Sequence, residues 1–393
     1  MIQEPFYLIL ILFAVVLTAG WWHDRFKNAK IIRLLPTPIF CYLPPTILTT
    51  AGILPYQSPV YDWITRFVLP ASLILLLMTT DIDGLKKVGR LALIAMLGAS
   101  LTVFIGGVSA FFIYRNQLGP EAPKEIGTLM ASWIGGTINE LAVKEATGLS
   151  DMLFAPLFIA DITAVYVWMT LLMILSGRQK KMDQFLHATK TRREMFESEE
   201  APKTAPLAEA QERRISMRSV FLCMAVGFGV GSFSSWVGNQ IPELDFAINR
   251  GTWVIIVITT FGLVLAFTRF AKKEREPATK IGYFLLYFVL ASTGAKAHLL
   301  AIVKAPLLLA VGFVWIAIHG ILYIIYARIF RIPSGMLATA SQANLGGVVS
   351  APIVASTYEP GLVSVGLLLA LLGNAAGNYA GILTAQLLQF LSS

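Results

Sequence analysis

Two glycine pairs inside apolar stretches decide the fold of this chain: GGTINE at residues 135–140 and GGVVSA at residues 346–351. Each pair occupies the same place in a repeated block. A long apolar segment follows each pair and carries one polar residue near its middle, Asp161 in the first block and Asn374 in the second. A membrane chain that duplicates a glycine-interrupted helix and a helix with a central polar residue is typical of secondary transporters.

The composition is that of a polytopic helical membrane protein. Hydrophobic residues make up 56% of the 393 residues and charged residues only 14%, whereas soluble proteins carry roughly a quarter charged residues. Many apolar runs reach about 20 residues, the length that crosses the hydrocarbon core as a helix. The formal charge of +8 is concentrated in short loops, which indicates topology and contact with anionic lipid rather than nucleic-acid binding.

Apolar segments long enough to be membrane spans are predicted at twelve places. They are residues 6–22, 34–54, 60–80, 91–114, 125–148, 152–175, 220–236, 251–270, 281–294, 300–329, 336–357 and 362–391. A polar stretch at 177–218 separates a first half, 1–176, from a second half, 219–393. We interpret this stretch as a solvated linker or an amphipathic surface helix. The N-terminus lacks the basic region of a signal peptide, so we expect the first segment to be an ordinary anchor.

The duplication extends beyond the glycines. Thr80 and Thr293 each end a segment before a repeated block, and Gly106 and Gly320 fall at equivalent points of the next helix. The offset between the copies stays between 211 and 214 residues. A fixed long period of this kind indicates internal duplication.

A glycine pair inside a membrane segment predicts a break in the helix. Glycine weakens a helix by about 1 kcal/mol relative to alanine, and in lipid each unpaired backbone group costs several kcal/mol. A break is therefore tolerated only where protein or a water-filled cavity covers it, and the freed helix ends can then bind ions. The alternative is that the glycines serve close helix–helix packing, which is common in membranes.

The two segments with glycine pairs are also the least apolar ones. The first contains Ser132, Thr137, Asn139 and Glu140, and the second contains Gln342 and Asn344. Glu140 and Lys144 are four residues apart and can pair along one helix face. The alternative, which we favour for Lys144 and Glu145, is a position at the membrane interface.

Asp161 is the carboxylate placed deepest in a predicted segment. At that depth a carboxylate costs several kcal/mol unless it binds a cation, takes a proton or faces water. We therefore expect Asp161 to carry the coupling ion or proton and to face the point where the breaks meet; the alternative is a structural role, such as capping a broken helix. Its counterparts in the second block are Asn374 and Asn378, whose amides can bind a solute or ligate a metal ion but cannot change charge.

These observations give two sets of candidate residues. The solute-binding set is Gly136, Thr137, Asn139, Gly347, Asn374 and Asn378, and the set for cation binding or proton coupling is Ser132, Glu140, Asp161, Gln342 and Asn344. We expect no cofactor other than a sodium ion, for which Asp161, Glu140 and Gln342 are the candidate ligands.

The sequence carries no catalytic constellation, so we expect neither an enzyme nor a catalytic residue. His298 and His319 are lone histidines, for which we expect packing or interface roles without specific partners. Cys41 and Cys223 lie far apart in predicted segments and suggest neither a metal site nor a disulfide.

At these residues the chain resembles a known family. The segments 129–139 and 342–347, together with Asp161 and Asn374, are similar to those of the YjcL-like family (domain of unknown function 819). More broadly, they resemble the cation:proton antiporter and anion transporter superfamily, which includes the bile-acid:sodium and glutamate:sodium symporters. The likeness covers residues 34–391.

The resemblance implies an all-α fold of two inverted repeats with crossing broken helices. Scaffold helices would lie at 6–80 and 219–294 and core helices at 91–176 and 300–391, with an elevator-like movement of the core and a homodimer formed through the scaffold. Inverted repeats need an odd number of crossings between equivalent points, but six predicted segments lie between Thr80 and Thr293. The orientation in the membrane is therefore left unassigned.

The sequence favours a secondary active transporter in a bacterial inner membrane. It would move a small anionic solute, coupled to sodium ions or protons, with the lipid bilayer and no nucleic acid as partners. A channel-like or regulatory membrane protein without coupled transport is the alternative from another class, and a membrane-embedded enzyme is a weaker third.

Overall fold

The computed structural model describes residues 2, 4–26, 37–86, 88–191, 215–243, 249–300 and 305–392. Within these ranges the regular structure is helical and contains no strand. The chain forms two compact units. Unit 1 takes in Met1–Thr79, Lys144–Ile162 and Ile215–Leu308, and unit 2 takes in Thr80–Val143, Thr163–Arg214 and Leu309–Ser393.

Eight of the described helical spans are long and apolar enough to cross a membrane. They are Pro5–Trp22 within α1 (Pro5–Phe26), the continuous run of α4 (Pro59–Trp63), η1 (Ile64–Val68) and α5 (Leu69–Met78), α7 (Arg90–Tyr114), α10 (Asp151–Ser176), α13 (Met217–Gln240), α16 (Arg275–Ala295), α17 (Ala305–Ile329) and α20 (Leu362–Ser392). All eight coincide with predicted segments. The chain is an integral, multi-pass membrane protein.

Two other predicted segments are shorter helices than expected. Residues 34–54 give α3 (Thr37–Thr50), which contains Pro44 and Pro45, and residues 251–270 give α14 (Arg250–Ala266) and a separate short helix, α15 (Arg269–Lys273). The Thr268 side chain accepts a hydrogen bond from the Ala271 N–H, so α15 starts as a new helix with its own N-cap.

Both predicted helix breaks are present. Residues 125–148 divide into α8 (Ala122–Gly135) and α9 (Thr137–Thr147), with Gly136 between them. Residues 336–357 divide into α18 (Ser334–Leu345) and α19 (Gly347–Tyr358), with Gly346 between them. Each half is too short to span a membrane alone.

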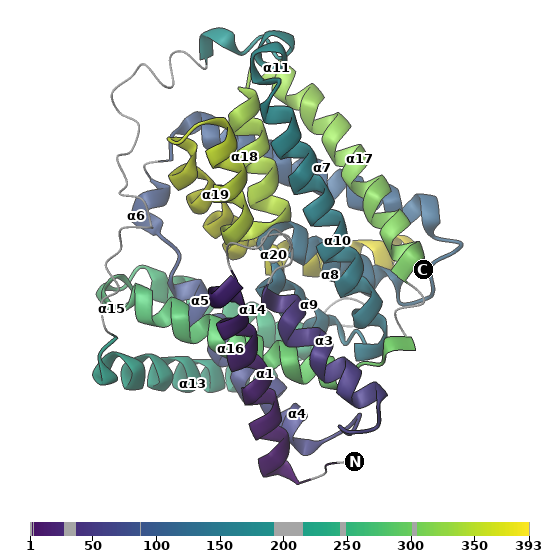
Figure 1. Ribbon diagram of the computed structural model, residues 1–393, viewed down its shortest axis with the longest axis vertical. Coiled ribbons are helices and arrows are strands. Elements are labelled where there is room, and N and C mark those ends of the chain that lie inside the picture. The colour runs from purple at the N-terminus through teal and green to yellow at the C-terminus, as the bar shows by residue number, and fades with distance from the viewer. Residues whose placement is uncertain are drawn as a thin grey trace. The chain divides into compact units, whose positions relative to one another are not determined.

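In unit 1, glycines allow three helices to pack closely on α5. The last turn of α5 lies against Gly227 of α13, Gly262 of α14 and Gly282 of α16. These contacts place the end of α5, the start of α13, the end of α14 and the start of α16 at one end of this four-helix bundle. The short helix α15 lies at that same end (Figure 1).

In unit 2, which begins with the short helix α6 (Ile82–Leu85), α7 and α17 pack antiparallel. Tyr323 donates a hydrogen bond to the Ala95 carbonyl over 2.8 Å, and Trp315 Nε1 donates to the Val103 carbonyl over 2.6 Å. The later residue of α7 is thus paired with the earlier residue of α17, so the two helices run in opposite directions. The antiparallel order matters because these two helices occupy equivalent places in the predicted repeat.

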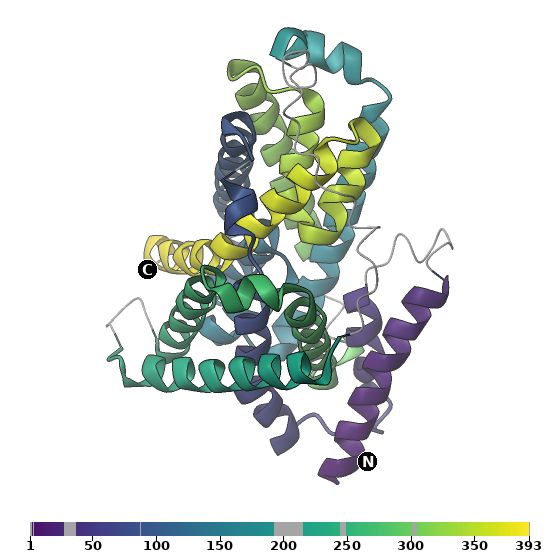
Figure 2. The same ribbon diagram turned by 90° about the vertical axis from the view of Figure 1, so that its left-hand side faces the viewer.

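A row of small residues joins α8 and α20, also antiparallel. A β-carbon at Gly381 would lie 2.6 Å from Ala131 Cβ, and one at Gly377 would lie 2.8 Å from Gly135 Cα. Small residues recur every four positions on both helices, which lets two backbones approach closely in a membrane. Figure 2 shows α20 as the yellow helix that ends at the C-terminus.

The described part of the 177–218 stretch is more than a solvated connector. It forms α11 (Gln179–Phe185), whose buried Asp183 accepts hydrogen bonds from the Ser334 N–H (2.8 Å) and hydroxyl (2.6 Å). Asp183 therefore caps the start of α18. Residues 192–214, with most of the predicted linker charges, lie outside the described residues.

Candidate functional site

In both pairs, the first glycine leaves space for a neighbouring side chain and the second adopts a positive φ. The first glycine of each pair has no room for a β-carbon: the Asn139 amide fills the space beside Gly135, and the Ser350 hydroxyl and the Gln342 amide fill it beside Gly346. The second glycine, Gly136 or Gly347, has a positive φ, of 83° and 65° respectively, which glycine adopts with little steric cost. The two pairs therefore share these two features, although the residue between the helices is Gly136 in the first break and Gly346 in the second.

A side-chain amide bridges each break. Asn139 Nδ2 in α9 donates to the Gly135 carbonyl at the end of α8 over 2.7 Å. Gln342 Nε2 in α18 donates to Ser350 Oγ in α19 over 2.9 Å. The oxygens of the same amides, Asn139 Oδ1 and Gln342 Oε1, are buried and accept no hydrogen bond from a described residue. A buried acceptor without a partner costs about 1–3 kcal/mol, so a hydrogen-bond donor or a cation at either oxygen would be stabilising.

The two breaks lie against each other within unit 2. A β-carbon at Gly347 would be 4.0 Å from Gly136 Cα, and one at Gly136 would be 3.8 Å from Asn374 Oδ1 of α20. Asn378, one turn further along α20, is buried. These predicted residues therefore lie around one place; their role as a solute site stays a prediction.

Ser132, Thr137 and Glu140 also belong to the first break. The Ser132 carbonyl accepts the Gly136 N–H over 2.6 Å, and Thr137 is the first residue of α9. Glu140 is fully buried in the first turn of α9, where the partial positive charge of a helix start favours a carboxylate.

Asn344 has a full set of structural contacts. Its Nδ2 donates to the Ala340 carbonyl over 3.0 Å, and its Oδ1 accepts the Ser100 hydroxyl over 2.8 Å. Ser100 belongs to α7, so Asn344 ties α18 to α7. A cation-binding role for Asn344 stays a prediction.

Asp161 lies in the middle of α10 and is 4% exposed. It is grouped with unit 1, whereas Gly136 and Gly347 belong to unit 2. Its helix runs through both units, with the boundary after Ile162. The expectation that Asp161 faces the meeting point of the breaks stays a prediction.

Both histidines have specific partners, so the expectation of partnerless histidines is wrong. His298 Nδ1 accepts the Leu300 N–H over 3.0 Å and its ring stacks on Tyr56, whereas His319 has two buried hydroxyl partners.

His319 Nδ1 lies 2.8 Å from Thr102 Oγ1 on α7, and its Nε2 lies 2.9 Å from Ser341 Oγ on α18. Trp168 Nε1 on α10 donates to the same serine oxygen over 2.9 Å. Because Ser341 accepts this N–H, its own hydroxyl is available to donate to Nε2 of a neutral histidine. One hydrogen-bonded chain thus joins four helices of unit 2.

Replacing His319 with alanine is expected to destabilise the protein by about 2–4 kcal/mol, because it removes two buried hydrogen bonds and opens a cavity. The melting temperature of the purified protein measures this. His298→Ala is the matched control, since His298 is partly exposed and its replacement should cost less than about 1 kcal/mol. Equal losses in the two variants would show that the His319 chain contributes nothing.

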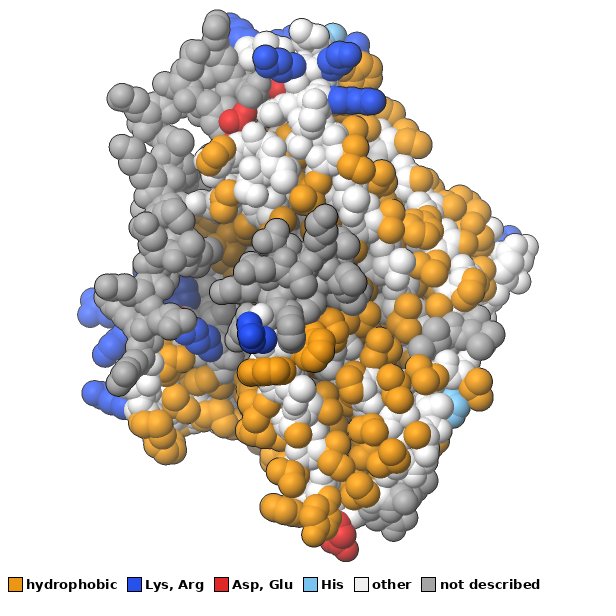
Figure 3. Space-filling view, viewed as in Figure 1, with side chains coloured by type: hydrophobic (Ala, Val, Ile, Leu, Met, Phe, Trp, Pro, Cys, Tyr) orange, Lys and Arg blue, Asp and Glu red, His pale blue; other side chains and the backbone are white. Residues whose placement is uncertain are grey.

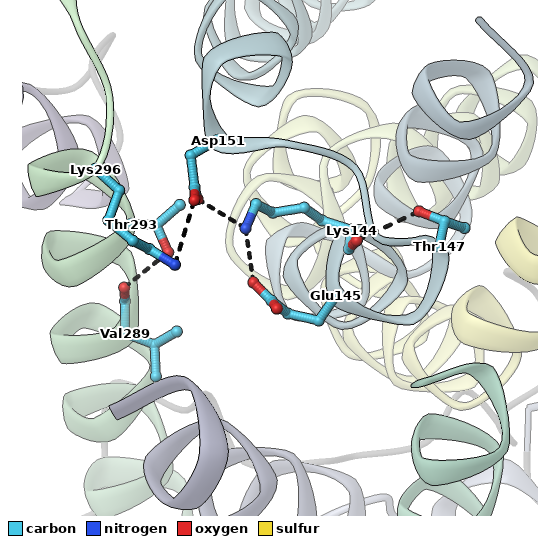
Figure 4. A network of polar contacts seen from close by, with 7 residues as sticks. All are labelled: Lys144, Glu145, Thr147, Asp151, Val289, Thr293 and Lys296. Carbon is cyan, nitrogen blue, oxygen red and sulfur yellow. Dashed lines mark hydrogen bonds and ion pairs between the residues drawn. The ribbon is translucent and has the colours of Figure 1, made fainter. Parts of the chain in front are cut away.

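A second polar cluster, in unit 1, was not predicted. Lys144 is 2% exposed, and its expected position at the membrane interface stays a prediction. Its Nζ lies 2.6 Å from Glu145 Oε1 and 2.8 Å from Asp151 Oδ1, and Lys296 Nζ lies 3.3 Å from Asp151 Oδ2. Figure 4 shows both lysines pointing at the Asp151 carboxylate, Lys144 from α9 and Lys296 from its position directly after α16. The cluster balances two positive and two negative charges, which allows a lysine to be buried.

Two hydroxyl groups close to this cluster bind the last carbonyls of α9, the second half of the first broken helix. Thr252 of α14 donates a hydrogen bond to the Ala146 carbonyl over 3.1 Å, and Thr147 donates to the Lys144 carbonyl over 3.3 Å. The last carbonyls of a helix have no partner within it. These hydroxyls supply partners at the end of α9.

Comparison with known proteins agrees with the assignment to the membrane. The family described as "Protein of unknown function (DUF819)" matches residues 10–391. The chain belongs to this family. A relative, the "Uncharacterized membrane protein YjcL" of Bacillus subtilis (strain 168), is 25% identical over 345 residues, which cover 85% of each chain. The family resemblance read from the glycine pairs and Asp161 is confirmed.

Proposed function

We propose that this DUF819 protein is a secondary active transporter that moves a small anionic solute across the membrane, coupled to sodium ions or protons. The observation that carries the proposal is the contact between the two helix breaks at Gly136 and Gly347. Broken helices inside a membrane bundle are the usual binding-site architecture of secondary transporters, because their freed backbone groups bind solutes and ions.

Two buried amide oxygens support a cation at the breaks. Asn139 Oδ1 and Gln342 Oε1 each lack a hydrogen-bond donor among the described residues, and Glu140 adds a buried carboxylate next to Asn139. Amide and carboxylate oxygens are the ligands that hard cations prefer. A sodium ion at either amide would supply the missing partner.

The starts of the second half-helices support an anionic solute. α9 begins at Thr137 and α19 at Gly347, and the first N–H groups of a helix attract negative charge. No arginine occurs in α8, α9, α18 or α19. The solute would therefore be held by backbone N–H groups and by the amides of Asn374 and Asn378.

An elevator-like movement of inverted repeats is the proposed mechanism. Most of the predicted core lies in unit 2 and most of the predicted scaffold in unit 1, with residues 144–162 of the predicted core grouped with unit 1. The antiparallel packing of α7 on α17 supports inversion, because these helices are equivalent in the repeat. If each of the six segments between Thr80 and Thr293 crossed the membrane in strict alternation, α7 and α17 would run parallel. We infer that one of the six does not complete a crossing.

A thermal screen tests the function. The purified protein is melted with a panel of small carboxylates and other anions, in sodium chloride and in choline chloride, and at two pH values. A coupled transporter should be stabilised by one solute class, and more strongly with sodium or at one pH. Stabilisation by solute regardless of cation and pH would favour an uncoupled channel or regulator, the alternative from another class.

The asparagines of α20 provide the sharper test of the site. If Asn374 and Asn378 bind the solute, Asn374→Ala and Asn378→Ala should weaken affinity by about 1–3 kcal/mol, roughly 5- to 150-fold, for each group left unpaired. If they only join helices, the variants should lose stability, about 0.6 kcal/mol per bond, and keep their affinity. Solute affinity and melting temperature measured on the same samples separate the two roles. A lowered melting temperature with unchanged affinity would remove both residues from the site.

A further inference from the structure

One end of the α5, α13, α14 and α16 bundle in unit 1 is strongly basic. The residues of unit 1 there include six basic and two acidic ones, which leaves a net charge of +4: Arg218, Arg269, Lys272, Lys273, Arg275 and Lys280 against Glu274 and Glu276. One of the acids, Glu274, is buried, and the other forms an ion pair with Lys280 at 2.9 Å. Figure 3 shows blue side chains gathered at this end, beside α15.

The geometry of α15 turns its charges outward. Ala271 is buried on the inner side of this five-residue helix, whereas Arg269, Lys272 and Lys273 are exposed. Phe267, at the end of α14 immediately before α15, is 65% exposed. Exposed basic residues next to an exposed aromatic ring at the end of a membrane helix fit the boundary between lipid headgroups and acyl chains.

The opposite end of the same bundle is electrically balanced. Its described charges next to the helix ends are Asp62 and Arg66 at the start of the α4–α5 run, Glu243 and Arg250 between α13 and α14, and Lys296 directly after α16, which is paired with Asp151 at 3.3 Å. Glu243 and Arg250 approach each other to 3.7 Å. The charge difference between the two ends is therefore a property of the folded bundle, not of one loop.

We propose that the α15 end of this bundle faces the cytoplasm and binds the headgroups of anionic phospholipids. Basic residues in short loops are retained on the cytoplasmic side. The cytoplasmic leaflet carries anionic lipid, and each lysine or arginine near it strengthens the attraction by roughly fivefold. Arg269, Lys272 and Lys273 of α15 form the centre of the lipid-binding surface. The proposal is independent of the transported solute and of the helix breaks.

Lipid titration tests the binding surface. Short-chain phosphatidylglycerol is added to the purified full-length protein in neutral detergent and the melting temperature is followed; short-chain phosphatidylcholine and inorganic phosphate are the comparison ligands. Phosphatidylglycerol alone should stabilise the wild type, with a response that weakens in high salt. The variant Arg269→Gln/Lys272→Gln/Lys273→Gln should need a phosphatidylglycerol concentration roughly 100-fold higher for the same stabilisation, because each of the three lost charges contributes roughly fivefold. The matched variant Arg66→Gln/Arg250→Gln, at the balanced end, should respond as the wild type does.

Three outcomes would overturn lipid binding at α15. They are an equal response to phosphatidylcholine, an equal response to inorganic phosphate, and an undiminished response to phosphatidylglycerol in the triple variant.

Cysteine labelling tests the orientation. Both native cysteines, Cys41 and Cys223, are fully buried, so the wild type should give a low background with a membrane-impermeant maleimide. Glu243→Cys should be labelled on intact cells, and Lys273→Cys only after the membrane is permeabilised. The reverse pattern would place α15 outside the cytoplasm and contradict the proposal.

Discussion

Alanine in place of Asp161 should abolish coupled uptake and leave the protein folded. The carboxylate is buried in the middle of α10, where its charge is costly unless a cation or proton accompanies it. Without the carboxylate the driving ion loses its ligand, so uptake driven by a sodium or proton gradient should fall to the level of empty proteoliposomes. The measurement is gradient-driven uptake of the solute found in the thermal screen.

The choice of substitution identifies the role of this residue. Asp161→Asn keeps the size of the side chain but not its charge, so it should retain solute binding and lose the dependence on the gradient. Asp62→Ala removes an exposed carboxylate of unit 1 and should transport normally. Full, still-coupled transport in Asp161→Ala would remove Asp161 from the coupling mechanism.

A second large loss is expected for Gly136→Ala. Gly136 has φ 83° with an extended ψ of −180°, a region used almost only by glycine that costs other residues about 1–3 kcal/mol. No clash adds to this strain, since the nearest atom to a β-carbon is 3.8 Å away. Relief of the strain would move the start of α9. Solute affinity should therefore fall by about tenfold or more, as 1.4 kcal/mol is one factor of ten.

Gly89→Ala is the matched control for this strain. Gly89, immediately before α7, has φ 66° and ψ 149°, and a β-carbon there would meet nothing within 4 Å. Both variants should lose a similar amount of stability, but only Gly136→Ala should lose affinity. An equal loss of affinity in the two would mean that general destabilisation, not the shape of the break, is responsible.

Features that recur in the chain could be predicted from the sequence. The glycine pairs stand in two copies at a fixed offset, and both helices break where the pairs predicted. The separate structural role of each glycine could not be predicted. The space beside Gly135 and Gly346 is occupied by polar side chains, and their positions depend on the folded break. The division of residues 251–270 into α14 and α15 had a local signal, Thr268 as an N-cap, which hydropathy does not register.

Contacts between distant segments were the part that sequence reasoning missed. Thr102 lies 217 residues from His319, and Asp183 lies 151 residues from Ser334, so no local pattern joins these partners. For Lys144 the sequence offered Glu140, four residues away, as an ion-pair partner. Its ion pairs are instead with Glu145 and Asp151, and Lys296, just after α16, also contacts Asp151.

The central claim is that the paired breaks form an ion-coupled transport site. Charge displacement on a solid-supported membrane tests it most directly, because it needs no knowledge of the solute. Proteoliposomes with the protein are exposed to rapid jumps in sodium concentration and in pH. The wild type should give a transient charge displacement in at least one of the two jumps, and Asp161→Ala should give none. A wild-type signal identical to that of empty liposomes in both jumps would contradict the claim.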